Sequence, residues 1–240
     1  MLLKNVIYAL LAVAVASCTP TNTANNETTA APTDTTITTT SSATATEATV
    51  PPATTSSAAA EENRPMSQYE NKVAELHTSA GEIDIRFFPD VAPNHVKNFI
   101  DLAEKGFYNG TKFHRVIPGF MIQGGDPNTV SGSPATWGTG GSGKNVAAEF
   151  NSISHKRGIV SMARSNDKNS ASSQFFIVTS DSTFLDNQYT VFGQVTKGMD
   201  VADKIVNAPK GAQDRPNSPT SIDKIVIRDA KPDEQGPAPK

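Results

Sequence analysis

The sequence has a single cysteine among its 240 residues and no long hydrophobic run. One cysteine cannot form a disulfide within the chain or build a zinc knuckle or an iron–sulfur site, and the four histidines lack metal-ligand spacing. Lys and Arg number 21 against 24 Asp and Glu, so the chain lacks the basic excess that is typical of nucleic-acid binding. We therefore expect no metal, no cofactor and no nucleic-acid partner.

The first 18 residues have the pattern of an export signal. Lys4 precedes a short apolar run from 6 to 15, which is too short to cross a hydrocarbon core of about 30 Å as a helix. The run ends in Val15-Ala16-Ser17-Cys18, which resembles the lipobox of bacterial lipoproteins. The resemblance implies a signal peptide at 1–17, cleavage before Cys18 and attachment of a lipid to its thiol. The alternative is an ordinary signal peptide, cleaved elsewhere, with a cysteine there by chance.

A segment poor in large apolar residues follows the cysteine. Residues 19–60 contain sixteen threonines and ten alanines, and no aromatic residue occurs from 19 to 65. Such a segment cannot bury enough apolar surface to offset an ordering entropy of about 1–2 kcal/mol per residue. We therefore expect 18–65 to be a lipidated cysteine with a disordered linker, and 231–240, with three prolines, to be a disordered tail.

The lipoprotein resemblance also implies a location. A lipid on Cys18 would anchor the protein to a membrane of the bacterial cell envelope. Thr19 stands where some lipoproteins carry an aspartate that retains them in the inner membrane. The outer membrane, with the domain facing the periplasm, is therefore favoured if the cell is Gram-negative. We expect a monomer, since nothing in the sequence demands a larger assembly.

Residues 66–230 have the patterning of one folded domain. Apolar and polar residues alternate on both sides of Ser79-Ala80-Gly81, which predicts a β-hairpin. Apolar residues at helical spacing predict helices over 93–104 and 199–206. The other apolar runs predict short strands at 112–117, 120–123, 158–163, 174–179, 191–195 and 222–227. Many short strands with two separated helices favour a mainly β fold, a closed antiparallel barrel, over a sheet of βαβ units.

Residues 113–126 read Phe-His-Arg-Val-Ile-Pro-Gly-Phe-Met-Ile-Gln-Gly-Gly-Asp. This run resembles the signature segment of cyclophilins, the cyclosporin-type peptidyl-prolyl isomerases. Further motifs continue the resemblance in the family's order, at 158–163, 173–177, 184–186 and 191–193. The resemblance covers 73–227 and implies a closed eight-stranded barrel with a helix at each end and a substrate groove on its outer face. It also implies activity on proline-containing polypeptides.

The reaction itself sets modest chemical demands. Rotation about a peptide C–N bond meets a barrier of about 18–20 kcal/mol, because resonance conjugates the nitrogen with the carbonyl. X–Pro bonds populate both isomers and exchange over roughly tens to hundreds of seconds. Removing ~7 kcal/mol from the barrier accelerates exchange by about five decades. Apolar groups that hold the proline ring and one fixed cation can supply that difference, without a nucleophile.

The resemblance assigns roles to individual residues. By position in the motif, Arg115 corresponds to the catalytic arginine, whose guanidinium hydrogen-bonds toward the prolyl amide. Phe120, Met121, Phe176 and Leu185 match the proline pocket, and Gln123 matches the amide that contacts a substrate carbonyl. The complete set of substrate-binding positions is Phe120, Met121, Gln123, Ala163, Arg164, Gln174, Phe176, Phe184, Leu185 and Tyr189.

Simpler interpretations exist for each of these residues. The apolar ones could be barrel core, and Arg115 could be a surface ion pair. Their occurrence together in one ordered template favours the catalytic interpretation. A module that captures proline-containing peptides without turnover is the alternative function, and a purely structural lipoprotein is a third. The intact Arg115 favours the enzyme, because capture alone would not require it.

Four positions depart from the best-known eukaryotic pattern. Phe184 replaces tryptophan and Tyr189 replaces histidine, and the lost indole N–H predicts weak cyclosporin binding. Arg164-Ser165 replaces Asn-Ala, which adds a positive charge at the groove edge. The Gly/Ser/Pro-rich stretch 126–145 contains Trp137, which we expect to cover the barrel rather than to shape access to the groove.

Overall fold

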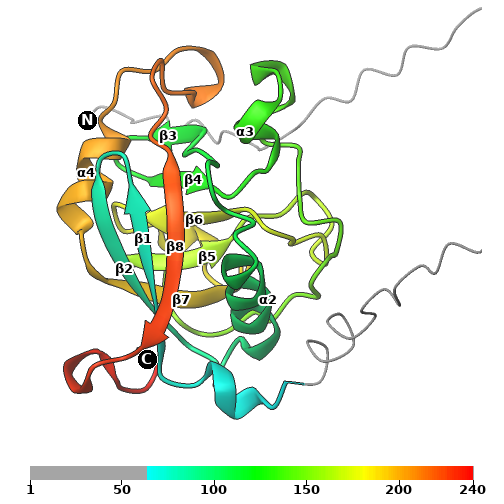
Figure 1. Cartoon of the computed structure of the whole chain (residues 1–240), viewed down its shortest axis with the longest axis vertical. Coiled ribbons are helices and arrows are strands. Elements are labelled where there is room, and N and C mark those ends of the chain that lie inside the picture. The colour runs from blue at the N-terminus through cyan, green and yellow to red at the C-terminus, as the bar shows by residue number, and fades with distance from the viewer. Residues whose placement is uncertain (1–63, 240) are drawn as a thin grey trace, which may run out of the picture. The chain divides into compact units, whose positions relative to one another are not determined.

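The computed structural model describes residues 64–239, so Cys18 and the predictions made for 1–63 lie outside the described residues. Eight strands form one antiparallel sheet in the order β3-β4-β6-β5-β7-β2-β1-β8 (Figure 1). The strands are β1 Lys72–Thr78, β2 Gly81–Phe87, β3 Arg115–Ile117, β4 Met121–Gly124, β5 Ile159–Met162, β6 Phe175–Val178, β7 Val191–Lys197 and β8 Ile222–Asp229. The mainly β fold is therefore confirmed.

The local predictions agree closely with the structure. β1 and β2 form the predicted hairpin, with Thr78 opposite Gly81. The two predicted helices are α2, Pro93–Glu104, and α4, Met199–Val206, and both contribute buried residues to the same core of the curved sheet. A third, short helix, α3 at Asn128–Ser131, lies within the Gly/Ser/Pro-rich stretch 126–145.

The predicted closed barrel is wrong, because the sheet is a half-barrel with β3 and β8 as its edges. β3 has only three residues, and the carbonyl of Val116 on its edge accepts a hydrogen bond from Lys210 Nζ at 3.0 Å. Backbone hydrogen bonds connect the two edges only next to β3: Gly110 N donates to Ile222 O at 2.7 Å, and Phe113 N donates to Thr220 O at 3.0 Å. The segment before β3 thus pairs with the start of β8, whereas β3 itself does not pair with β8.

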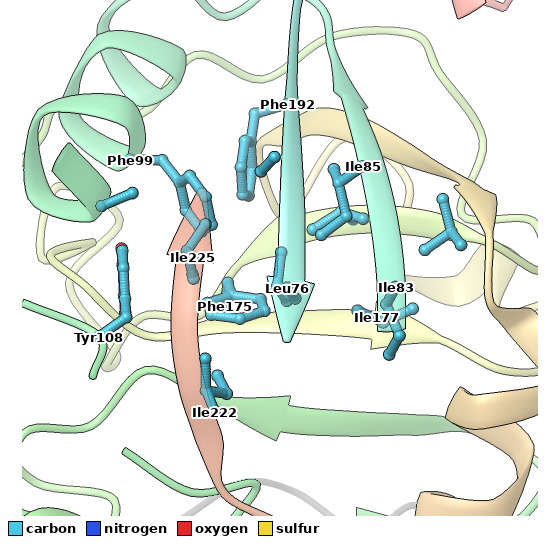
Figure 2. Close-up of a cluster of buried hydrophobic side chains, with 14 of the residues drawn as sticks. Leu76, Ile83, Ile85, Phe99, Tyr108, Phe175, Ile177, Phe192, Ile222 and Ile225 are labelled. Atoms are coloured by element: carbon cyan, nitrogen blue, oxygen red, sulfur yellow. The ribbon is translucent and has the colours of Figure 1, made fainter. Parts of the chain in front are cut away.

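The core fills the concave side of the sheet beneath α2 (Figure 2). Phe99 of α2 is fully buried, and its ring centroid lies 4.9 Å from that of Tyr108 and 5.4 Å from those of Phe175 and Phe192. Burial of each such side chain stabilises the fold by roughly 1.5–3 kcal/mol, so this aromatic cluster contributes strongly to the stability of the domain.

Glu149 caps the N-terminus of α2 from a distant part of the chain. Its carboxylate accepts hydrogen bonds from the backbone N–H groups of Asn94 at 3.1 Å and His95 at 3.0 Å. It also accepts from Asn94 Nδ2 and lies 2.7 Å from His95 Nδ1. Ala92, at the N-cap position, has no side-chain oxygen, so Glu149 satisfies the amides that a local cap would otherwise satisfy.

The C-terminal residues differ from the predicted disordered tail. Pro232–Glu234 forms a short 3-10 turn, η5. Glu234 accepts two hydrogen bonds from the guanidinium of Arg228, at 2.6 and 2.7 Å, and one from the backbone of Lys231 at 2.8 Å. Composition suggested disorder because the tail carries few apolar residues, whereas one bidentate ion pair holds its first part against β8.

Candidate active site

The site begins with a row of side chains that crosses four strands. Arg115 on β3 is paired with Gln123 on β4, which is paired with Phe176 on β6, which is paired with Ser161 on β5. Directly paired residues of an antiparallel sheet point to the same face, so these side chains share one face of the sheet. Val116 and Ile122, the next residues along β3 and β4, point to the opposite face and join the core.

A relay of amides fixes the orientation of Gln123. Gln123 Nε2 donates to Gln174 Oε1 at 2.9 Å, and Gln174 Nε2 donates to the carbonyl of Gly140 at 2.8 Å. The amide oxygen of Gln123 therefore faces Arg115, whose Nη1 lies 3.4 Å away. Gln174 is buried, so the relay is shielded from water at its centre.

Arg115 is a partly buried cation. Its side chain is 25% exposed, and Nε lies 3.9 Å from Asp214 Oδ2. Burial lowers the pKa of Arg115 from its ordinary value, while the charge of Asp214 and the neighbouring Tyr189 oppose that shift. A guanidinium in such a setting stays protonated at neutral pH, so it offers a permanent charge with a planar set of donors.

An apolar cluster lies beside Arg115 on the same face. Its buried members include Met121, Phe176 and Leu185, and Phe120, Ala163 and Tyr189 pack at its margin. The rings of Phe176 and Tyr189 meet edge-on at 5.7 Å. Phe184 is 65% exposed and lies outside the cluster, with its ring 5.4 Å from that of Phe120. The face therefore carries an apolar cluster, and on the β3–β4 side of this cluster lie one cation, Arg115, and the amides of Gln123 and Gln174.

Ala163 and Arg164 form another border of this cluster, just beyond β5. Ala163 N donates to the carbonyl of Gln174 at 2.9 Å, so its backbone amide is used within the fold. The guanidinium of Arg164 lies over the ring of Tyr189 at 4.6 Å and donates to the carbonyl of Gln188 through Nε and Nη2. The sequence-predicted catalytic and substrate-binding residues thus gather around one apolar cluster, with Phe184 contacting it through Phe120.

Comparison with known proteins assigns the chain to a family. Residues 73–227 match the family model of cyclophilin type peptidyl-prolyl cis-trans isomerases. The chain belongs to this family. Its reaction class is the cis–trans isomerisation of X–Pro peptide bonds, as the sequence motif predicts.

Individual relatives of this cyclophilin are bacterial and eukaryotic. It is 45% identical over 163 residues to a probable peptidyl-prolyl cis-trans isomerase of Brucella abortus, covering 66% of this chain and 83% of the relative. It is 42% identical over 167 residues to a peptidyl-prolyl cis-trans isomerase of Acinetobacter baylyi, covering 66% and 86%. A cyclophilin from Cryptosporidium parvum, crystallised in the presence of the dipeptide Ala-Pro, superposes with a TM-score of 0.59 and 32% identity, covering 65% of this chain and 98% of that one.

Sequence reasoning about this cyclophilin missed one supporting residue of the apolar cluster. His155 is fully buried, and its ring stacks on Phe176 with centroids 6.1 Å apart and an interplanar angle of 15°. Its Nδ1 lies 3.0 Å from Asp186 Oδ1 and its Nε2 lies 3.2 Å from Ser161 Oγ. Burial lowers the pKa of His155 against the opposing effect of Asp186. The buried histidine therefore packs against the Phe176 ring and holds that ring in place within the apolar cluster.

Two further properties concern residues 64–239 alone. No group of three or more His, Cys, Asp and Glu side chains in this part of the chain is arranged to hold a metal ion. None of the helices described there is long and apolar enough to cross a membrane.

Proposed function

We propose that this cyclophilin accelerates X–Pro isomerisation by holding the proline ring on the apolar cluster and directing Arg115 at the prolyl nitrogen. During rotation the nitrogen becomes pyramidal and its lone pair leaves conjugation with the carbonyl. A donor aimed at that nitrogen localises the lone pair and so stabilises the twisted amide more than the planar one. The observation that carries the proposal is the register that places Arg115, Gln123 and Phe176 in one row.

The remaining residues of the face receive binding roles in this proposal. Phe120, Met121, Phe176 and Leu185 would contact the proline ring, and Gln123 would contact a flanking carbonyl. The Ala-Pro dipeptide in the crystals of the Cryptosporidium parvum relative supports a proline-containing ligand. Ala163, Arg164 and Gln174 would border the bound backbone, and Phe184 and Tyr189 would contact the residues that flank the proline. We also propose that cyclosporin binds weakly, because Phe184 has no indole N–H.

Exchange of an Ala-Pro-Phe-type peptide tests the proposal. We expect the protein to accelerate cis–trans exchange, and Arg115→Ala to lower kcat/KM by about 100-fold or more, since the aimed donor is lost. Arg157→Ala is the matched control, because Arg157 is an exposed arginine paired with Asp203. Peptide binding without faster exchange would instead support the capture module. Circular dichroism of each variant excludes loss of the fold as the cause.

We propose, from the sequence alone, that Cys18 carries a lipid that anchors the enzyme in the bacterial envelope, with the outer membrane favoured if the cell is Gram-negative. Two or more acyl chains would make the anchor stable, whereas one chain gives marginal binding. Cys18→Ser should move the protein from the membrane fraction to the soluble fraction and abolish incorporation of labelled palmitate. Unchanged fractionation and labelling would contradict the proposal. The envelope location predicts unfolded or flexible envelope proteins as substrates.

A further inference from the structure

We propose that Asp214 is a positioning residue for Arg115, holding the Nε edge of the guanidinium while Gln123 holds the Nη1 side. The inference rests on the proposed function, because it takes Arg115 to be the residue that contacts substrate. Asp214 lies on η4, Ala212–Asp214, in the loop between α4 and β8, far from the motif that carries Arg115. Neither composition nor the family resemblance singled it out.

The geometry places the Asp214 carboxylate between two cations. Oδ2 lies 3.9 Å from Arg115 Nε, and Oδ1 lies 2.8 Å from Lys210 Nζ. Both members of the Arg115–Asp214 pair are partly shielded, with side chains 25% and 37% exposed. Lys210 also donates to the carbonyl of Val116, the residue that follows Arg115 on β3. The carboxylate is therefore fixed to the same strand that carries the arginine.

The backbone around Asp214 is strained, which is the second observation. Gln213 and Asp214 have φ of 61° and 57°, so two successive residues other than glycine adopt the left-handed conformation. Each such residue costs of order 1–3 kcal/mol, and strain of this kind persists where the surrounding structure holds it in place. Gly211 N donates to Arg215 O at 2.8 Å across this turn. The turn thus directs a carboxylate at Arg115 at a cost in local stability.

A ring contact links this turn to the loop on the other side of the relay. The guanidinium of Arg215 lies 5.4 Å from the ring centroid of Trp137, and Lys112 Nζ lies 5.8 Å from it. The loop that carries Trp137 also supplies the Gly140 carbonyl that ends the Gln123–Gln174 relay. Arg115 is therefore linked to two loops, to one through Asp214 and to the other through the Gln123–Gln174 relay, and these loops contact each other at Trp137. Trp137 is the chain's single tryptophan, so its fluorescence reports on this contact.

A double-mutant cycle tests the inference. We expect Asp214→Asn to lower kcat/KM for an Ala-Pro-Phe-type peptide by about three- to tenfold, because Arg115 is then less well oriented. In the Arg115→Ala background the same substitution should change the residual exchange rate by less than about twofold. A merely structural residue would cause the same loss in both backgrounds. NMR exchange at high protein concentration measures the residual rates.

Further variants separate positioning from folding. Asp214→Glu keeps the charge and should restore most of the lost rate. Asp229→Asn removes an exposed carboxylate of β8 that pairs with Lys72 of β1, and should leave the rate unchanged. Unaltered Trp137 emission and circular dichroism would show that the turn is intact. Two results would overturn the role of Asp214 but leave the proposed function standing. One is an equal loss of rate from Asp214→Asn in both backgrounds, and the other is no loss from Asp214→Asn while Arg115→Ala is inactive. Full activity of Arg115→Ala would overturn the proposed function and this inference with it.

Discussion

Gln123 faces Arg115 with its amide oxygen, 3.4 Å from Nη1. The amide nitrogen cannot take that place, because it donates to Gln174. The contact is long for a hydrogen bond, so it orients the guanidinium without binding it tightly. Arg115 is thus guided on one side by a neutral acceptor, which leaves its charge available for a substrate.

The neutrality of that acceptor leads to the first prediction. Gln123→Glu places a carboxylate beside the partly buried guanidinium, and the charged pair should hold Arg115 away from the substrate. It also sets a carboxylate oxygen against Gln174 Oε1. We expect kcat/KM for X–Pro exchange to fall by about tenfold or more, and the free energy of unfolding to fall by about 1–3 kcal/mol because buried Gln174 Oε1 loses its donor.

Gln194→Glu is the matched control for this substitution. Gln194 Oε1 accepts from Arg86 Nη2 at 2.8 Å, so it offers a second Gln–Arg pair in the same domain. The control should leave the exchange rate within about twofold of the unmodified protein. Equal rates for Gln123→Glu and the unmodified protein would contradict the role given to the neutral amide.

The second prediction concerns the cap of α2. Burial tends to raise the pKa of Glu149, but hydrogen bonds from His95 and Asn94 outweigh it and hold the pKa below its ordinary value of 4.5. The ionised carboxylate therefore stabilises the fold above pH 4.5, and this contribution is lost as the pH falls through the folded pKa. Glu149→Gln should lower the free energy of unfolding at pH 7 by about 1–2 kcal/mol.

Urea unfolding at several pH values checks this prediction. The difference between Glu149→Gln and the unmodified protein should shrink toward acid pH. Glu82→Gln, at an exposed carboxylate near Lys197, is the control and should change stability by less than about 0.5 kcal/mol at pH 7. A difference that stays constant with pH would show that the carboxylate charge does not stabilise α2.

A third prediction concerns the C-terminal tail. Hydrogen bonds from Arg228 lower the pKa of Glu234 to about 2. At pH values above 4.5, the ordinary glutamate pKa, the ion pair therefore holds the tail against β8. Its contribution is lost as the pH falls from 4.5 to about 2. Glu234→Gln should expose residues 230–239 to proteolysis and speed their amide exchange at neutral pH.

Asp233→Asn provides the comparison for the tail, because Asp233 is the exposed neighbour of Glu234. Its amide-exchange rates should match those of the unmodified protein. If amide exchange and proteolysis of residues 230–239 are as slow in Glu234→Gln as in the unmodified protein, the ion pair does not hold the tail.

Much of this domain could be predicted from the sequence because its signals are local. The helices follow from apolar residues at helical spacing, and the hairpin follows from alternation around Gly81. The site residues on β3 and β4 are close in the chain, so one motif places Arg115 beside Gln123. Met121, Phe176 and Leu185 are mostly buried, which agrees with their simpler interpretation as core as well as with a pocket.

The features that escaped prediction depend on long-range contacts. Nothing near Pro93 indicates that Glu149 caps the helix, and nothing near Arg115 indicates that a left-handed turn directs Asp214 toward it. At the edge of the sheet, Lys210 donates to the carbonyl of Val116, a contact that no periodicity reveals. These contacts arise from how the loops fold back onto the sheet.

The most direct test of the central claim separates binding from catalysis at Arg115. NMR exchange with a saturating amount of protein measures isomerisation of the bound peptide, and titration measures its affinity. If Arg115 stabilises the twisted amide, Arg115→Ala should keep the affinity within about threefold and slow the bound exchange by about 100-fold or more. Unchanged bound exchange with weakened affinity would contradict the account, because Arg115 would then only hold the peptide.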